Sequence, residues 1–318
     1  MKVSVILPTY NNARTLRECL ESLKLQDYKK NTEILVIDGG SSDDTLKIAK
    51  EFRCKIIKNS FRVEEKARLI GISKAKNELL LFIDADNVLI GNDFITKMVK
   101  PFEDKEIVAS ETLSYSYRKK DNLVTKYCSL VGGDDLIAIY LGIYDRFNYF
   151  KNKWTDMPVV QEKKDGYIKI KLDKKKIPAM GSNGFIIRKS VLKSLKLTTF
   201  IHTDIIYKIA NLDHYFAKVP VSLVHVLFGI SDFFKKKIRR IKRRSSGEIK
   251  QYDYGISKWK MFKTSIYFLL IIPIFYDMIK GFIRKPTLAW LFHPIAVYGT
   301  SLIYLYYFII KRFFKSIF

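Results

Sequence analysis

The stretch from Leu79 to Asn87 constrains the fold of this 318-residue chain more than any other. Its first five residues, Leu-Leu-Leu-Phe-Ile, are apolar and predict a strand buried on both faces of a parallel sheet. Two carboxylates, Asp84 and Asp86, follow at the carboxyl end of that strand. Residues two apart in an extended segment point to the same side, and open α/β sheets bind ligands at this edge. We therefore expect both carboxylates to face one ligand, with a divalent cation bridging them to phosphate oxygens. Capping of a turn or helix is the alternative for such a pair.

Apolar runs and amphipathic segments alternate at short intervals before this stretch. Strands are predicted at residues 2–7, 33–37 and 55–58, and helices at 46–52 and 63–76. Another helix is expected after Asn12, whose side chain can cap it. This alternation predicts an α/β fold with a Rossmann-like, mostly parallel sheet and flanking helices.

Four motifs follow one another in this part of the chain: Ser4–Asn11 (SVILPTYN), Val36–Thr45 (VIDGGSSDDT), Ala67-Arg68 with Gly71, and Phe82–Asp86 (FIDAD). Together they resemble the amino-terminal half of family 2 glycosyltransferases, which have the GT-A fold, and the resemblance continues to about residue 230. It implies a GT-A domain over residues 1–230. The nucleotide-sugar-binding half would cover residues 1–110 and the acceptor half residues 111–230.

The resemblance implies which residues contact the nucleotide of a UDP- or GDP-sugar. Pro8, Thr9 and Tyr10 are expected to line the base and the ribose. Asp38 is expected to reach the base or the ribose, because a carboxylate accepts well from an imide N–H or a hydroxyl. A turn residue at the end of a strand is the alternative for Asp38.

It also implies a diphosphate and metal site. Arg68 would face the diphosphate, although a solvated helix face is the alternative for this residue. Asp84 would contact the ribose or the metal, Asp86 the metal, and Ala85 belongs to the same nucleotide-sugar site. The metal would be Mg²⁺ or Mn²⁺. His225 lies where many GT-A enzymes have a late histidine that joins the metal shell, and a packed or hydrogen-bonded histidine is the alternative.

The acceptor side is expected to use one catalytic carboxylate. In the family an acidic pair lies at a helix start, and its second member acts as the general base on the acceptor hydroxyl. Asp204 matches that residue, while Thr203 replaces its acidic neighbour. Capping of the helix predicted over residues 205–212 is the alternative role for Asp204.

The region between residues 119 and 180 shows weaker patterns. The spacing of its apolar residues predicts one amphipathic helix over 134–150. The basic stretch 151–176 surrounds a short predicted strand at 167–170 and is interpreted either as a loop over the acceptor or as a surface insertion.

The C-terminal part of the chain combines positive charge with long apolar runs. The formal net charge is +25, and residues 235–244 read KKKIRRIKRR. Such charge favours phosphate, in nucleic acid or in anionic headgroups, and the apolar runs that follow favour lipid. Residues 231–261 are predicted to form a basic amphipathic interfacial segment, and residues 262–318 a transmembrane hairpin. Basic flanks place the catalytic domain on the cytoplasmic face of a membrane. Buried helices of a soluble protein are the alternative.

These expectations describe a membrane-anchored inverting glycosyltransferase. Its partners would be a nucleotide-sugar donor, membrane lipids and a lipid-linked acceptor such as a polyprenyl or dolichyl phosphate or a glycan built on one; no nucleic acid is expected. One alternative is a nucleotidyltransferase on the same fold. Another is a non-catalytic basic protein that binds nucleic acid or membrane, for which two carboxylates at a strand end have no use.

Overall fold

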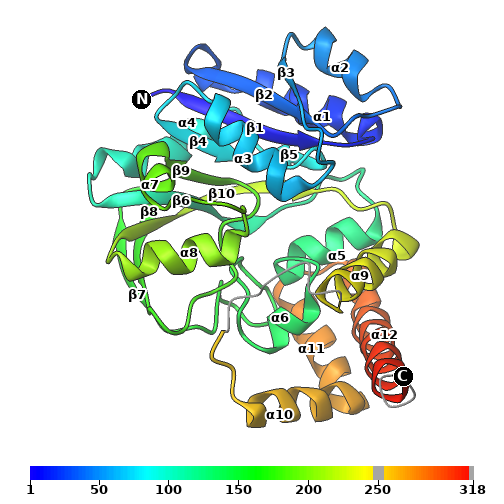
Figure 1. Ribbon diagram of the computed structural model, residues 1–318. Helices are drawn as coiled ribbons and strands as arrows, with labels where there is room; N and C mark the ends of the chain where they lie inside the picture. Colours follow the sequence, from blue (N-terminus) through cyan, green and yellow to red (C-terminus); the bar gives the residue numbers. More distant parts are fainter. Residues whose placement is uncertain (246–253, 315–318) are drawn as a thin grey trace. The chain divides into compact units, whose positions relative to one another are not determined.

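The computed structural model describes residues 1–245 and 254–314 (Figure 1). They form two compact units, one made of residues 1–116 and 157–226, the other of residues 117–156 and the described residues from 227 onward. Residues 117–156, which the sequence placed in the acceptor half of the first domain, thus belong with the C-terminal helices. The borders expected at residues 110, 230 and 261 stay predictions.

The first unit is built on one ten-stranded sheet with the order β3-β2-β1-β4-β9-β6-β10-β8-β7, and β5 pairs with β10. Its strands are β1 (Val3–Thr9), β2 (Thr32–Asp38), β3 (Lys55–Lys58), β4 (Leu79–Phe82), β5 (Asn87–Leu89), β6 (Ile107–Tyr115), β7 (Val159–Lys164), β8 (Tyr167–Leu172), β9 (Phe185–Arg188) and β10 (Tyr215–His225). The first four neighbours, β3, β2, β1 and β4, run parallel, as the sequence predicts. Beyond them the sheet is mixed, because β9 runs antiparallel to both β4 and β6.

The helices of this unit are α1 (Ala13–Lys24), α2 (Thr45–Glu51), α3 (Glu64–Lys74), α4 (Phe94–Val99), α7 (Lys189–Ser194) and α8 (His202–Asn211), with 3₁₀ turns at Asp27–Asn31 and Lys100–Glu103. The apolar faces of α1, α2 and α4 pack on the sheet in one core. Asn12 occupies the N-cap position of α1, as predicted, but its side chain makes no capping hydrogen bond. Its Oδ1 atom accepts from the backbone N–H of Tyr10 at 2.8 Å instead, because the residue belongs to the turn after β1.

The basic stretch 151–176, interpreted as a loop over the acceptor or a surface insertion, contains a hairpin, and the strand predicted at 167–170 is confirmed as β8. Strands β7 and β8 are antiparallel, and Lys164 pairs with Tyr167 across the turn Asp165-Gly166. Gly166 has φ +82°, the conformation that two-residue hairpin turns require. The Asp-Gly dipeptide is the sequence signal for this turn, and the strand before it was missed because its polar residues show no apolar alternation.

The second unit is helical. It contains α5 (Leu123–Val131), α6 (Leu136–Tyr140), α9 (Ile230–Ser245), α10 (Lys258–Leu269), α11 (Ile271–Arg284), the 3₁₀ turn η3 (Leu288–Leu291) and α12 (Phe292–Phe314). The single helix predicted over 134–150 is wrong, because α6 ends at Tyr140. Gly142 follows with φ +76° and lies so close to Asp156 that an added Cβ would be 2.7 Å from the Cβ of that residue. The chain therefore turns back here, while its apolar side chains still enter the helical core.

Helix α9 covers most of the basic run, and much of its apolar face packs inside the unit. Phe233 is fully buried, with its ring centroid 5.4 Å from that of Phe292 on α12. Lys237 is also buried and lies 3.1 Å from Asp134, whose carboxylate pairs with Arg240 at the same distance. Burial lowers the pKa of Lys237. Part of the surface that was predicted to face a membrane interface is therefore buried inside the protein. Residues 246–253 of the predicted segment lie outside the described residues.

The last two apolar runs behave differently from each other. The first, predicted as a marginal span, is divided into α10 and α11, which meet at 85° (Figure 1). The second contains Leu288–Tyr307, which is long and apolar enough to cross a membrane. Residues 315–318 of the predicted hairpin lie outside the described part of the chain.

Candidate active site

The carboxyl ends of β1, β2, β4 and β10 meet at one edge of the sheet. Strands β1, β2 and β4 are mutually parallel. Strand β10 runs in the same direction, since it is parallel to β6 and β9 is antiparallel to both β6 and β4. The segments that follow these strands carry most of the residues singled out in the sequence, so the topology gathers them at this edge.

The segment after β4 presents its two carboxylates away from the core. Ala85 is 3% exposed and belongs to the apolar core, whereas Asp84 and Asp86 remain partly accessible. The expected alternation of sides is confirmed. The methyl group of Ala85 lies in the core, so the nucleotide-sugar contact expected of this residue would use its backbone and stays a prediction.

Asp86 and His225 lie against each other. The Nε2 atom of His225, the last residue of β10, is 3.3 Å from Oδ2 of Asp86. The antiparallel pairing of β5 with β10 places Asn87 opposite His225, and the side-chain amide of Asn87 donates to Oδ1 of Asp86 at 2.9 Å. Asp86 and His225 are 139 residues apart in the sequence, so no local pattern predicts their contact, which depends on the pairing of β5 with β10.

Arg68 forms a buried charged group beside Asp84. One guanidinium nitrogen lies 2.9 Å from Oδ1 of Asp84 and 2.7 Å from Oε1 of Glu64, one helical turn earlier on α3. Burial by itself lowers the pKa of Arg68, but the carboxylates of Glu64 and Asp84 outweigh it and raise the pKa above its ordinary value. The Nε atom of Arg68 is buried and has no partner among the described residues. The guanidinium is thus held in place and charged, and its Nε–H donor is left for another group.

Phe200 connects this pair to the start of α8. Its ring centroid is 4.6 Å from that of Phe82, the last residue of β4, and the guanidinium carbon of Arg68 lies 5.4 Å from it. Asp204 is in the first turn of α8, two residues after the helix begins. Ile201 occupies the N-cap position, so Asp204 is not the N-cap residue of this helix, and its role as the base stays a prediction. Neither Phe200 nor Glu64 was singled out in the sequence, although Glu64 and Arg68 have the i, i+4 spacing of helical ion pairs.

Asp38 anchors the turn that follows β2. Its carboxylate accepts from the Thr9 hydroxyl at 3.1 Å, from the Ser41 hydroxyl at 2.5 Å, and from the backbone N–H groups of Gly40 and Ser41 at 2.8 and 2.9 Å. Four donors match the four acceptor positions of a carboxylate. Asp38 is 4% exposed, so it holds the turn, which leaves its expected contact with the base or ribose a prediction.

The last two residues of β1 and the residue that follows them differ in exposure to solvent. Pro8 is half-buried and Thr9 is buried, as its bond to Asp38 requires. Tyr10 is 49% exposed and its ring is therefore open to a ligand. An added Cβ on Gly39 would lie 3.4 Å from the Tyr10 ring, so the turn and the ring are in close contact.

The donor set fits a divalent ion whose coordination is completed by a substrate. In the described residues, no group of three or more His, Cys, Asp or Glu side chains is placed to enclose a metal. Mg²⁺ and Mn²⁺ prefer oxygen ligands, and Mg²⁺ commonly takes only one or two protein carboxylates plus phosphate oxygens. The adjacent Asp86 and His225 side chains, with Asp84 nearby in sequence, provide such a partial set.

Comparisons with known proteins show the family of this chain. The family model described as "Glycosyl transferase family 2" matches residues 4–196. Poly(ribitol-phosphate) beta-N-acetylglucosaminyltransferase TarS from Staphylococcus aureus is 36% identical over 96 residues, which are 28% of this chain and 17% of TarS. Glycosyltransferase GlyG from Streptococcus pneumoniae is 30% identical over 160 residues, 48% of this chain and 51% of GlyG. The chain thus spans about half, or less, of the length of these relatives.

A solved structure shares the fold. Mannosyltransferase PcManGT from Pyrobaculum calidifontis, determined in complex with GDP-Man and Mn²⁺, superposes with a TM-score of 0.56 over 95% of this chain and 86% of that one. Their sequences are 14% identical, so the likeness concerns the fold alone.

Proposed function

Because the chain belongs to glycosyl transferase family 2, we propose that it transfers a sugar, with inversion, from a nucleotide-diphosphate sugar to a lipid-linked acceptor. The observation that carries this proposal is the meeting of Asp86, His225, Asp84 and Arg68 at the carboxyl edge of the sheet. Two carboxylates, an imidazole and a buried guanidinium form a set suited to a metal-bound diphosphate.

The donor diphosphate is the group that these side chains would bind. Asp86 and His225, with Asp84, would hold Mg²⁺ or Mn²⁺, which supplies positive charge to the departing diphosphate. Arg68 offers its unpartnered Nε–H to a phosphate oxygen, and its charge is maintained by Glu64 and Asp84. UDP- and GDP-sugars both fit this chemistry, and the accessible ring of Tyr10 is available to the base.

Asp204 is proposed as the general base. Phe200 packs against Phe82 and under Arg68, which brings the first turn of α8 to the end of β4. A carboxylate there accepts the proton of the attacking acceptor oxygen as that oxygen displaces the diphosphate from the anomeric carbon. Direct displacement by one nucleophile inverts the configuration of the sugar.

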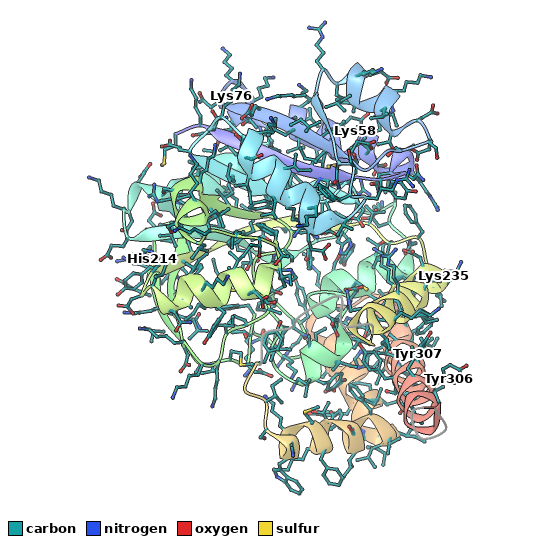
Figure 2. The ribbon with its side chains drawn as sticks, in the orientation of Figure 1. Lys58, Lys76, His214, Lys235, Tyr306 and Tyr307 are labelled. Atoms are coloured by element: carbon teal, nitrogen blue, oxygen red, sulfur yellow. The ribbon has the colours of Figure 1, made fainter. Side chains whose placement is uncertain are left out.

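The C-terminal helices support a membrane location. Of the 30 large hydrophobic side chains exposed in the described residues, 19 lie between Trp259 and Tyr306. A bilayer would cover apolar side chains that are exposed in such number over one stretch of helices. Tyr306 and Tyr307 lie near the end of the candidate span (Figure 2), where aromatic residues commonly meet the membrane interface. Basic residues at the flanks favour a catalytic domain on the cytoplasmic face.

A lipid-linked acceptor follows from that location. An enzyme held at a membrane meets acceptors that are themselves anchored there, such as a polyprenyl or dolichyl phosphate or a glycan built on one. The metal dependence and the acceptor are parts of the same proposal and are tested together.

The test measures nucleotide release by the full chain in detergent. UDP- and GDP-sugars are incubated with Mn²⁺, with and without a polyprenyl phosphate, for the native protein and for Asp86→Asn. We expect one donor to turn over and release a nucleoside diphosphate, dependent on metal and lipid. We expect Asp86→Asn to lose about 100-fold or more. Asp93→Asn is the matched control, because Asp93 is exposed and pairs with Lys97 away from the site.

Other outcomes separate the alternatives. Release of inorganic diphosphate identifies a nucleotidyltransferase. Turnover on soluble acceptors without lipid contradicts the acceptor assignment, and equal activity of Asp86→Asn and Asp93→Asn contradicts the metal assignment. If no donor turns over while donor binding survives Asp86→Asn, the protein is a binding protein and not an enzyme.

A further inference from the structure

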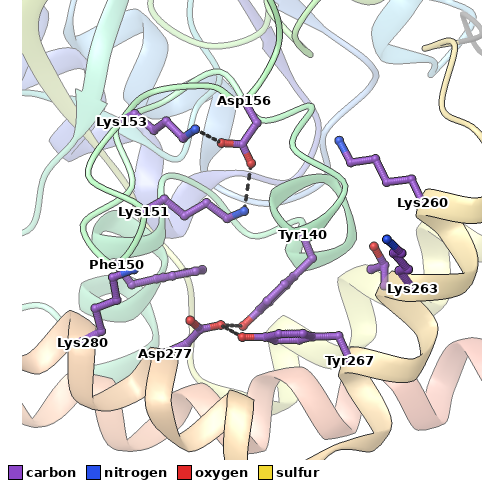
Figure 3. Close-up of a pocket in the computed structure, with 11 residues that line it drawn as sticks. Tyr140, Phe150, Lys151, Lys153, Asp156, Lys260, Lys263, Tyr267, Asp277 and Lys280 are labelled. Carbon is purple, nitrogen blue, oxygen red and sulfur yellow. Dashed lines mark hydrogen bonds and ion pairs between the residues drawn. The ribbon is translucent and has the colours of Figure 1, made fainter.

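A basic cavity of about 500 Å³ lies within the helical unit (Figure 3). Its wall carries five lysines: Lys151 and Lys153 from the segment after α6, Lys260 and Lys263 from α10, and Lys280 from α11. Two carboxylates, Asp156 and Asp277, also line it. The lining therefore has a formal excess of three positive charges, which favours a multiply charged anion.

The floor of the cavity is fixed by a chain of hydrogen bonds. The hydroxyls of Tyr140 and Tyr267 both donate to Oδ2 of Asp277, at 2.8 and 2.9 Å. The Tyr140 oxygen lies 3.0 Å from Nε2 of the buried His293, and the Nδ1 atom of that ring lies 2.8 Å from the Tyr127 hydroxyl. Since Tyr140 donates to Asp277, its oxygen accepts from Nε2–H, and Tyr127 donates to Nδ1. A neutral imidazole satisfies every bond, and the charge of Asp277 is held by two hydroxyls.

Asp156 orders one side of the wall. Its two oxygens lie 2.9 Å from the ammonium of Lys151 and 2.7 Å from that of Lys153 (Figure 3). Burial by itself raises the pKa of Asp156, but the hydrogen bonds from Lys153 and Lys151 outweigh it and leave the pKa below its ordinary value. One ionised carboxylate thus holds two ammonium groups together at the cavity.

The other side of the wall is set by aromatic contacts. The ammonium of Lys263 lies 5.1 Å from the centroid of the Trp259 ring, and that of Lys280 lies 5.9 Å from the Tyr276 ring. These contacts are weaker than a contact with a phosphate, so both ammonium groups can turn to an anion at small cost. The same helices expose apolar residues, among them Phe262 on α10 and Ile279 on α11, 54% and 51% exposed.

We propose that this cavity binds the phosphate group of a ligand, with the phosphate against Lys151, Lys263 and Lys280. The lysines provide point charges suited to phosphate, and the hydrogen bonds of the floor hold Asp277 away from pairing with them. The exposed apolar residues of α10 and α11 give an acyl chain a surface beside the cavity, which makes an anionic lipid headgroup one source and free phosphate the other. The residues that line this cavity differ from those proposed for glycosyl transfer. Phosphate binding to the cavity is therefore measured without a sugar donor.

The test is a calorimetric titration of the full chain in detergent. The probes are inorganic phosphate and mixed micelles that contain phosphatidic acid, with phosphatidylcholine micelles as the probe without net charge. We expect Lys263→Gln/Lys280→Gln to bind the phosphate probe about tenfold more weakly than the native protein, which corresponds to about 1.4 kcal/mol. Lys263 and Lys280 are replaced because neither pairs with Asp156. The ion pairs of Asp156 with Lys151 and Lys153 are then the same in the native protein and in the variant.

The matched control is Lys258→Gln/Lys285→Gln. Lys258 begins α10 and Lys285 directly follows α11; both are exposed, and neither lines the cavity. The change in net charge is the same as in Lys263→Gln/Lys280→Gln. We expect the control to bind within about twofold of the native protein. Tighter binding of phosphatidic acid identifies a lipid headgroup, and equal binding of inorganic phosphate identifies a soluble ligand; both support a phosphate site. Equal weakening in the two double variants, or no binding of either phosphate probe, overturns it.

Discussion

The ion pair between Glu111 and Lys218 should be among the most sensitive points of the first unit. Both side chains are fully buried, and Lys218 Nζ lies 2.6 Å from Oε2 of Glu111. The two residues face each other on the paired strands β6 and β10. The other oxygen of Glu111 accepts from the backbone N–H of Gly181 at 2.8 Å, so the pair also holds the segment between β8 and β9.

Lys218→Met removes the charge of one partner and keeps a side chain of similar length. The carboxylate of Glu111 is then buried without its cation, and breaking a buried pair in this way costs about 3–5 kcal/mol. For a unit of this size that loss corresponds to a fall in the unfolding midpoint of roughly 6–20 °C. The midpoint is measured by thermal unfolding of the full chain, followed by circular dichroism at neutral pH.

The control applies the same substitution to an exposed ion pair of the same sheet. Lys171 on β8 lies 3.2 Å from Asp213. The two side chains are 35% and 59% exposed, respectively. Solvent screens such pairs, so Lys171→Met should leave the midpoint nearly unchanged. The double variant Glu111→Gln/Lys218→Met removes both charges and keeps an acceptor for Gly181, and it should recover most of the loss.

Two results would refute this reasoning. If Lys218→Met and Lys171→Met lowered the midpoint equally, burial of the charge would not be the cause. If the double variant were as unstable as Lys218→Met, the loss would come from side-chain packing and not from an uncompensated carboxylate.

Three further changes test other parts of the structure. Arg68→Lys should lower kcat/KM roughly 10- to 100-fold with little loss of stability, because an ammonium cannot replace the planar donors that contact two carboxylates; steady-state kinetics check this. Gly132→Ala should lower the unfolding midpoint more than Gly40→Ala. Both glycines have positive φ, but only at Gly132 would the new Cβ lie 2.7 Å from a backbone oxygen, that of Arg146. Asp156→Asn should be less stable than the native protein near neutral pH. The difference should vanish as the pH falls below 3.8, because the lowered pKa of Asp156 contributes stability only while the carboxyl group is ionised; unfolding midpoints across pH would show whether it persists.

The two carboxylates of the proposed diphosphate site could be located from the sequence because their signals are local. The five apolar residues before Asp84 predict a buried strand, and the i, i+2 spacing predicts that Asp84 and Asp86 share a side. The structure confirms both points, and it places Ala85 in the core for the same reason of alternation. The parallel order of β3, β2, β1 and β4 follows from the short βαβ intervals.

Local patterns failed where a single residue changes the direction of the chain. The apolar spacing over 134–150 continues after α6, but Gly142 in a left-handed conformation ends the helical path. Likewise the apolar face of α9 suits a membrane, whereas Phe233 packs on Phe292 of α12. A periodic pattern predicts that a face is buried and does not identify what covers it.

The sequence by itself determined the fold class, the family and the strand ends that carry Asp84, Asp86 and His225, because each rests on spacing within a short segment. Only the tertiary structure decided which of these groups meet. The contact between Asp86 and His225 depends on the pairing of β5 with β10, and the packing of Phe200 under Arg68 depends on where α8 begins. The lysines of the basic cavity are likewise brought together from three separate segments. Contacts between distant residues arise from the packing of whole elements, to which local spacing is insensitive.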